Sequence, residues 1–453
     1  MTAGADPRLR QLVGDALVAD RVVPEGRVHA VTGIGIEVDG LAAGIGELCT
    51  IDATEPLVCE VVGFHDGRAV VMPFGDLRGV RPRAAVRGSG EALALPVGDD
   101  LLGRVIDPLG RPLDGGPPLL GPRRPIRGAP PPALSRPSID RVFETGVPVL
   151  DGLLTLGRGQ RIGIFAGSGV GKSTLLGSIA RGGAADVNVV ALIGERGREV
   201  RDYIDEVLGP EGLARSVVVV ATADSAPMLR LVGPHSALAI AEWFRDRGAH
   251  VLFTCDSVTR FANAAREVGL AAGEPPALRG YPPSLFAELP RLVERLGTAA
   301  TGSITGLLTV LVEGDDLDEP VADALRGHLD GHVVLDRQIA ARGRYPAVDV
   351  LRSVSRLMPR LATPGHSAAA TELRAMLARY EDARDLVQVG AYKRGADPRL
   401  DAILDRLPRI EAFLAGDVGE TDPRGGLGAT LRRLEELAGT GGSSTSAAFG
   451  ADR

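Results

Sequence analysis

The stretch that most constrains the fold is RIGIFAGSGVGKST, residues 161–174, which runs into STLLGSIA. The apolar run 161–166 predicts a strand, the glycines that follow predict a tight turn, and the next apolar residues have helical spacing. Backbone N–H groups in such a turn, together with the start of the helix, form a cradle for phosphate. The stretch therefore predicts one unit of a parallel sheet whose loop binds a phosphorylated ligand.

The turn supplies most of the candidate nucleotide-binding residues. Lys172 is expected to bridge the terminal phosphates, and the Ser173 hydroxyl to bind Mg²⁺. The strict pattern begins with glycine, whereas this chain has Ala166, which can end a strand in ordinary backbone geometry. The full set is Ala166, Gly167, Ser168, Gly169, Val170, Gly171, Lys172, Ser173 and Thr174.

Several further runs predict buried strands. They are VNVVALIG (187–194), SVVVVATA (216–223), HVLFTCD (250–256), GLLTVLVEG (306–314) and HVVLDRQIA (332–340). Continuous apolar runs that alternate with helical segments indicate a parallel sheet covered on both faces. The predicted core is thus an α/β, RecA-like P-loop domain.

Polar residues follow three of these strands. In a parallel sheet they meet outside the carboxyl ends of the strands, where ligands bind. Asp256 is a candidate Mg²⁺ ligand acting through water, with a helix N-cap as the alternative. Glu195 is a candidate general base, with a surface ion pair as the alternative. The others are Arg196, Arg260, Glu313, Asp315 and Asp316, of which Arg260 could orient Asp256 or reach a neighbour.

The rest of the chain divides by pattern. Residues 1–20 predict an amphipathic helix that docks a partner or packs on its own barrel. Short strands separated by turns over 21–93 predict a small β-barrel. The nucleotide-binding domain is expected over 94–366, with a proline-rich surface connector at 117–138. A helical domain (367–438) and a disordered Gly/Ser-rich tail (439–453) are expected to complete the chain.

Composition limits the classes of function. The formal net charge of −7 and the low aromatic content of 4% disfavour a nucleic-acid partner. The cysteines, Cys49, Cys59 and Cys255, are too few and too scattered for a disulfide framework or a metal cluster. No apolar run approaches the ~20 residues that span a bilayer. A cytoplasmic protein is the expectation.

Longer stretches resemble the ATPases of the rotary ATP synthase superfamily. They include GERGREV, DSVTRFANAAREVGLAAGEPPALRGYPPS, VEGDDLDEPVADALRGHLDGHVVL and PAVDVLRSVS. The order of these motifs and the wording LAAGEPPALRGYPPS are most similar to the ATPases of type III protein export. FAELPRL and VGAYKRG resemble the flagellar members more than the virulence injectisome members.

The resemblance implies a role for individual residues. Lys172, Ser173, Glu195 and Asp256 match the phosphate lysine, the Mg²⁺ ligand, the catalytic carboxylate and the Walker B acid, and Arg196 matches a phosphate-contacting arginine. Tyr345 matches a tyrosine that stacks on adenine, with core packing as the alternative. Arg356 matches an arginine finger that enters a neighbouring subunit's site, with an ion pair inside its own subunit as the alternative.

The resemblance also implies cofactors and partners. The cofactors are ATP and Mg²⁺, in a homo-oligomeric, hexameric ring. Further partners are a stator-like regulator at the N-terminal helix, a central stalk-like protein, export chaperones with their substrates, and the membrane export gate, to which the ring binds peripherally at the inner side of the cell membrane. A catalytic subunit of a proton-translocating ATP synthase, a non-catalytic nucleotide-binding subunit and a nucleic-acid translocase are the other classes considered.

Overall fold

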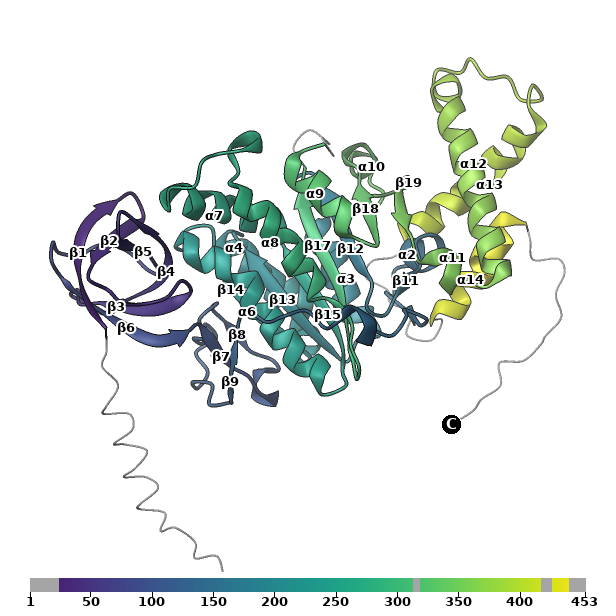
Figure 1. Ribbon diagram of the computed structural model, residues 1–453. Helices are drawn as coiled ribbons and strands as arrows, with labels where there is room; N and C mark the ends of the chain where they lie inside the picture. Colours follow the sequence, from purple (N-terminus) through teal and green to yellow (C-terminus); the bar gives the residue numbers. More distant parts are fainter. Residues whose placement is uncertain (1–23, 313–317, 417–425, 440–453) are drawn as a thin grey trace, which may run out of the picture. The chain divides into compact units, whose positions relative to one another are not determined.

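The computed structural model describes residues 24–312, 318–416 and 426–439 (Figure 1). By their contacts these residues form two compact units. The first holds the described residues up to Leu93 with 226–228 and 267–274, and the second holds the remainder. The predicted N-terminal helix, the tail beyond Gly439, and Glu313, Asp315 and Asp316 lie outside the described residues. No described helix is long and apolar enough to cross a membrane.

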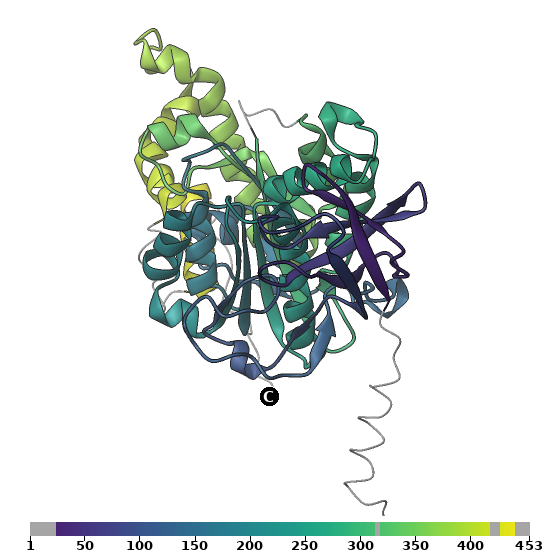
Figure 2. The same ribbon diagram turned by 90° about the vertical axis from the view of Figure 1, so that its left-hand side faces the viewer.

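The first unit is a closed six-stranded β-barrel with the strand order β1-β2-β5-β4-β3-β6 (Figure 2). Inward-facing Val, Ile and Leu side chains fill it, as at Val28, Ile36 and Ile51. Asp66 and Gly67, with φ of 48° and 75°, form the two-residue turn between β4 and β5. The strands are β1 Glu25–Thr32, β2 Gly35–Asp39, β3 Glu47–Ile51, β4 Leu57–His65, β5 Arg68–Pro73 and β6 Ala85–Ala92.

The second unit is built on a sheet with the order β19-β18-β12-β17-β15-β13-β14-β8, and β16 pairs with β17. All pairs along that order are parallel except β18–β19, which is antiparallel. The strands are β8 Val105–Ile106, β12 Arg161–Ala166, β13 Val187–Ile193, β14 Ser216–Ala221, β15 His250–Asp256, β16 Gly297–Thr298, β17 Ser303–Leu311, β18 Gly331–Leu335 and β19 Val348–Ser355. Every residue of β13, β14 and β15 is buried, as strands covered on both faces require.

The direction of each crossover assigns the helices to the two faces of this sheet. Right-handed crossovers put α3 and α5 on one face, because the chain moves from β12 to β13 to β14. The chain then returns through β15 and β17 to β18, which puts α6, α7, α8 and α9 on the other face. The bounds are α3 Lys172–Gly182, α4 Gly197–Asp202, a π-helix η3 Tyr203–Leu208, α5 Gly209–Ala214, α6 Pro227–Asp246, α7 Val258–Ala271, α8 Pro283–Glu294, α9 Pro320–His328 and α10 Arg337–Ala341.

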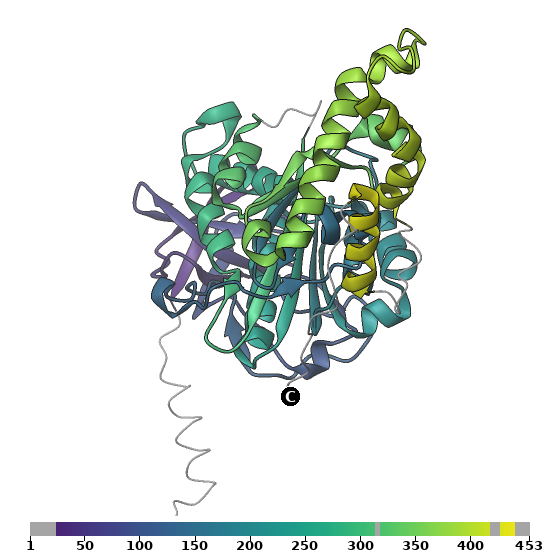
Figure 3. The same ribbon diagram turned by 90° about the vertical axis from the view of Figure 1, so that its right-hand side faces the viewer.

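Helices dominate the end of the chain. α12 Pro364–Gln388, α13 Pro398–Ala415 and α14 Gly426–Ala438 pack against one another and against the short helix α2 Pro148–Leu153 (Figure 3). Phe413, Leu434 and Leu437 belong to the same hydrophobic core as buried residues of the sheet. Thr363 caps α12 through its side chain, which accepts from the N–H of His366. The expected barrel, parallel-sheet core and helical domain are confirmed.

Smaller elements complete the second unit. β7 Ala94–Pro96 pairs with β9 Arg123–Pro125, so part of the proline-rich stretch 117–138 forms a short two-stranded sheet. β10 Val142–Phe143 pairs with β11 Leu156–Gly157. Single turns of 3-10 helix lie at Asp99–Leu101, Ala133–Ser135 and Leu278–Gly280, and α11 spans Met358–Leu361.

The prediction of one strand over 332–340 was wrong in its second half. β18 ends at Leu335, and Asp336 accepts hydrogen bonds from the N–H groups of Gln338 and Ile339, so it caps α10. The Asp side chain satisfies helix N–H groups that a strand would have paired with a neighbour. The apolar run therefore belongs to two elements, and the second brings a cationic side chain to the end of the sheet.

Candidate functional site

The phosphate-binding stretch leaves the sheet between β12 and α3. Gly169 and Gly171 have φ of 77° and 87°, which glycine adopts without the penalty of a Cβ. Val170 between them is 2% exposed and anchors the loop in the core, whereas Ser168 is exposed. Gly169 is exposed as well, so the loop is held at a buried residue while part of its backbone lies on the surface, as a phosphate cradle requires.

Lys172 and Asp256 meet at the edge where the parallel strands end, which we call the carboxyl edge. Lys172 begins α3, and its ammonium donates to Oδ1 of Asp256, the last residue of β15. Asp256 is 2% exposed, and its Oδ1 also accepts a 2.9 Å hydrogen bond from the Thr309 hydroxyl. A buried carboxylate that accepts hydrogen bonds from a cation and a hydroxyl is held in a fixed position.

Glu195 follows β13, which is separated from β12, the strand before the loop, by β17 and β15. Its Oε1 is 4.0 Å from Nζ of Lys172. Burial, and then the charge of Asp256, raise the pKa of Glu195 to about 7, although Lys172 opposes the shift. A hydrogen bond with Glu199 raises this pKa further and lowers the pKa of Glu199 itself. A carboxyl group whose pKa is near neutrality can accept a proton from water at working pH.

The two arginines near Glu195 are placed differently. Arg196 is exposed, and its Nη1 lies 3.5 Å from Oε1 of Glu199 in the first turn of α4. Arg260 packs its aliphatic stem against Gly194, where an added Cβ would come within 2.7 Å of the arginine Cβ. Both cations therefore border Glu195, with Arg196 turned toward Glu199 in this conformation.

Tyr345 and Arg356 lie at opposite edges of the sheet. The Tyr345 ring lies against the loop, where a Cβ on Gly171 would meet its Cδ1 at 3.1 Å, and the ring is 44% exposed. Arg356 follows β19, which runs antiparallel, so it lies where the parallel strands begin, an edge we call the amino edge. Its backbone N–H bonds the Asp330 carbonyl, and its exposed guanidinium lies 3.4 Å from the Arg326 carbonyl.

Two residues at the carboxyl edge were not predicted from the sequence to belong to the site. Thr309 looked like one polar residue within an apolar strand, and only the pairing of β17 with β15 puts it opposite Asp256. Arg337 was read as part of a strand, whereas it begins α10 and lies over Gly167. The Asp-Arg pair after VVL, with Asp as an N-cap, was the available signal for a helix start.

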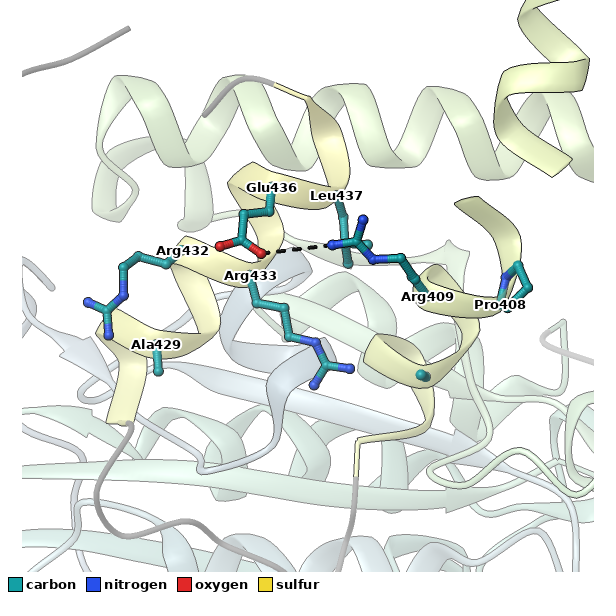
Figure 4. A pocket seen from close by; sticks show the side chains of 8 residues that line it. Pro408, Arg409, Ala429, Arg432, Arg433, Glu436 and Leu437 are labelled. Atoms are coloured by element: carbon teal, nitrogen blue, oxygen red, sulfur yellow. Dashed lines mark ion pairs between the residues drawn. The ribbon is translucent and has the colours of Figure 1, made fainter. Parts of the chain in front are cut away.

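A pocket lies away from this edge, between α13 and α14 (Figure 4). It measures about 520 Å³, and its arginines are Arg409, Arg432 and Arg433. Arg409 faces Glu436 at 3.9 Å, whereas Arg433 extends toward the Phe413 ring. The guanidinium groups do not converge on one point and no phosphate loop lines the pocket, so the reaction site is assigned to the carboxyl edge.

Family models match three parts of the chain. Residues 146–355 match the ATP synthase alpha/beta family, nucleotide-binding domain, and residues 28–90 match its beta-barrel domain. The chain belongs to this family. Residues 362–435 match the T3SS EscN ATPase C-terminal domain, so within the family the chain lies in the branch of flagellar and type III secretion ATPases.

Individual relatives are similar over most of their length. The flagellum-specific ATP synthase of Bacillus subtilis (strain 168) is 50% identical, covering 86% of this chain and 90% of the relative. The type 3 secretion system ATPase of Xanthomonas euvesicatoria is 51% identical, covering 86% and 89%. The assembled ATPase EscN from the enteropathogenic E. coli type III secretion system superposes with a TM-score of 0.86 at 41% identity, covering 91% of this chain and all of the other.

Proposed function

We propose that the carboxyl edge hydrolyses ATP with Mg²⁺ and that hydrolysis energises flagellar type III protein export. The observation that carries the proposal is Lys172, which begins a helix at a glycine loop and lies against Asp256 and near Glu195. Phosphoryl transfer needs a positioned phosphate, a bound cation and an oriented water. Each has a candidate group within this cluster.

The residues present fit Mg²⁺. Ser173 offers an exposed hydroxyl in the first turn of α3, and Asp256 offers a carboxylate oxygen besides the one that Thr309 and Lys172 hold. Oxygen donors of this kind, with water completing the shell, suit Mg²⁺. The bound cation would neutralise charge that develops on the terminal phosphates.

The remaining roles follow from position. Glu195, with its pKa raised to about 7, accepts a proton from the attacking water. Loop N–H groups and Lys172 bind the phosphates. Tyr345, exposed beside Gly171, stacks on the base. Arg196 and Arg260 border the water-binding side, and Arg196 must turn away from Glu199 to reach a phosphate.

Arg356 acts on a neighbouring subunit. The backbone N–H of Arg356 bonds the Asp330 carbonyl, and the backbone N–H of Asp330 bonds the carbonyl of Arg161, the first residue of β12. The phosphate loop follows Ala166, at the other end of this strand. Those five residue steps amount to roughly 16 Å at about 3.3 Å each. Arg356 is therefore badly placed for its own loop, whereas an exposed arginine at a subunit boundary can complete the next site. The assembled form of EscN supports a ring of identical subunits.

Export is favoured over ATP synthesis because the C-terminal helices match the T3SS EscN ATPase domain. A stalk-like partner is supported by the complex of EscN with its central stalk EscO, which has a TM-score of 0.84. We further propose a stator-like regulator, export chaperones with their substrates, and peripheral attachment at the export gate on the inner side of the cell membrane. The 51% identity to a type 3 secretion system ATPase makes injectisome export the second candidate.

Mixing two inactive variants tests the ring. Glu195→Gln lacks the base, and Arg356→Ala lacks the finger. Each alone should have little Mg²⁺-dependent ATPase activity, and their mixture should regain activity, because some interfaces pair an intact Glu195 with an intact Arg356. Wild-type specific activity should rise with protein concentration. Absence of ATPase activity in the wild type would refute the proposed reaction, and an inactive mixture would refute only the trans finger.

A deletion strain separates the two export pathways. The flagellar proposal predicts loss of motility that the wild-type gene restores and the Lys172→Arg gene does not. Normal motility together with loss of secreted virulence proteins would support injectisome export in its place.

A further inference from the structure

Arg337 is a cation at the nucleotide site to which no role has been given. We propose that Arg337 contacts the terminal phosphate of the bound nucleoside triphosphate from within the same subunit. The inference rests on the proposed function, because it concerns which phosphate of the bound nucleotide the site recognises. Three observations carry it: the register of β18 and β12, the contact with Gly167, and the partners of the neighbouring Asp336.

The register puts Arg337 beside the start of the loop. Leu335, the last residue of β18, pairs with Ala166, the last residue of β12. At this point β12 ends and the chain continues into the phosphate loop, and β18 ends and the chain continues into α10. Arg337 is therefore on the opposite side of the loop from Asp256 and Glu195, whose strands come after β17 in the sheet order.

The guanidinium lies directly on the loop. Nη2 of Arg337 is 3.0 Å from the position that a Cβ on Gly167 would take, and Cζ and Nε are at 3.8 Å. Gly167 is not among the glycines with positive φ, so its backbone does not call for glycine. Arg337 therefore approaches the loop backbone closely, and a Cβ on Gly167 would require the guanidinium to shift by a few tenths of an ångström.

Arg337 keeps its donors available. Among the described residues no hydrogen bond or ion pair engages its guanidinium, and the side chain is exposed. Asp336 does not neutralise it, because one oxygen caps α10 and the other lies 3.6 Å from Arg352. An exposed arginine on a phosphate loop, with a full set of N–H donors, suits the planar, bidentate recognition of phosphate.

The direction of the nucleotide identifies which phosphate is meant. Tyr345, the proposed base-stacking residue, lies against Gly171 at the helix end of the loop. Arg337 lies against Gly167 at the strand end. A nucleotide whose base is at Tyr345 therefore extends its phosphates along the loop toward Arg337. A diphosphate would end short of this guanidinium, and a triphosphate would reach it.

The experiment compares nucleotides in the full-length chain under conditions without turnover. Titration calorimetry with Mg²⁺ measures the affinity of a non-hydrolysable ATP analogue and of ADP for wild type, Arg337→Gln and Arg337→Lys. We expect Arg337→Gln to weaken the ATP analogue by about 10-fold to 100-fold, the loss typical of one charge-assisted contact, and ADP by less than about twofold. Arg337→Lys should recover part of the loss.

Arg342→Gln is the matched control, since Arg342 is the exposed C-cap of the same short helix. It should leave both affinities unchanged. Equal weakening of the ATP analogue and ADP by Arg337→Gln would mean that Arg337 only supports the loop, and unchanged affinities would mean that it does nothing there. Either result overturns the inference. Failure of the wild type to bind either nucleotide would overturn the proposed function instead.

Discussion

The two edges of the parallel sheet handle charge in opposite ways. At the carboxyl edge, Lys172 and Asp256 are largely buried and hold each other, and the Glu195 carboxylate is 4.0 Å from the same ammonium. At the amino edge, Arg356 is exposed, and among the described residues its guanidinium hydrogen-bonds only to a backbone carbonyl, at 3.4 Å. In the proposed mechanism one edge contains most of the reaction site, and the other presents a cation that acts outside its own subunit.

This difference predicts that nucleotide binding and ATP turnover depend on different groups. Groups at the carboxyl edge should control both steps within one chain, whereas Arg356 should control turnover alone and only when subunits meet. The following predictions test this separation, from the largest expected effect to the smallest.

Arg356→Ala should reduce ATP hydrolysis by about 10³-fold to 10⁵-fold at concentrations at which the wild type is assembled, as loss of an arginine finger does. In dilute protein, the affinity for a non-hydrolysable ATP analogue should stay within about twofold of wild type, because the guanidinium lies at the other edge of the sheet. Steady-state ATPase assays and calorimetry measure the two effects. Arg360→Ala, at a nearby exposed arginine, is the control. A fall in affinity in dilute protein would contradict the separation of the edges.

Lys172→Arg should lower hydrolysis by about 10³-fold, the upper end of the loss for one oxyanion-stabilising donor. Arginine keeps the charge, but its broad planar fork does not fit where a compact ammonium lies against Asp256. The thermal unfolding midpoint should change little. Lys393→Arg makes the same exchange at an exposed lysine and should leave ATPase activity intact. Activity of Lys172→Arg near the wild-type level would refute the assigned role.

The pH dependence should follow Glu195. Its raised pKa, about 7, means that the carboxyl is protonated below that pH and cannot accept a proton from water. We expect kcat/KM to rise about tenfold per pH unit below pH 7 and to level off above it. Glu199→Gln removes a negative charge and offers an N–H donor to the carboxylate, so the inflection should move to lower pH. An unchanged inflection in this variant would exclude coupling between the two glutamates.

Thr309→Val should have the smallest effect. It removes the hydroxyl that donates to Asp256 and leaves a side chain of similar shape. We expect hydrolysis to fall by less than about tenfold, because Lys172 still holds the carboxylate, and the free energy of unfolding to drop by about 1–3 kcal/mol. Thr309→Ser should restore most of both. Identical loss in the Ser and Val variants would indicate a packing role in place of hydrogen bonding.

Local pattern accounts for what could be predicted from the sequence. The bounds of β12 and β15 agree with the apolar runs at 161–166 and 250–256, since each run stops where a strand meets polar residues. Asp256 and Lys172 could be paired in advance because parallel strands end at a common edge. The expected roles of the individual site residues remain predictions.

Contacts across strands account for what could not be predicted. Thr309 meets Asp256 only through the register of β17 and β15, and nothing in the order of residues gives that register. Arg337 required the end of β18 to be placed within an unbroken apolar stretch. Gly169 and Gly171 have positive φ, which suits glycines in the predicted tight turn, whereas the close approach of Arg337 to Gly167 joins residues 170 positions apart along the chain.

β19 spans the sheet between two of the proposed site residues. Because it runs antiparallel to β18, Tyr345 precedes it at the carboxyl edge and Arg356 follows it at the amino edge. β19 pairs with β18 from Gly331 to Leu335, and these four residue steps amount to roughly 13 Å at about 3.3 Å each. In the proposed mechanism, one short strand thus connects the residue that stacks on a subunit's own nucleotide base with the arginine finger that enters the neighbouring site. We therefore expect a displacement of β19 on filling of one site to alter the neighbouring site, and the nucleotide-binding curve to be cooperative.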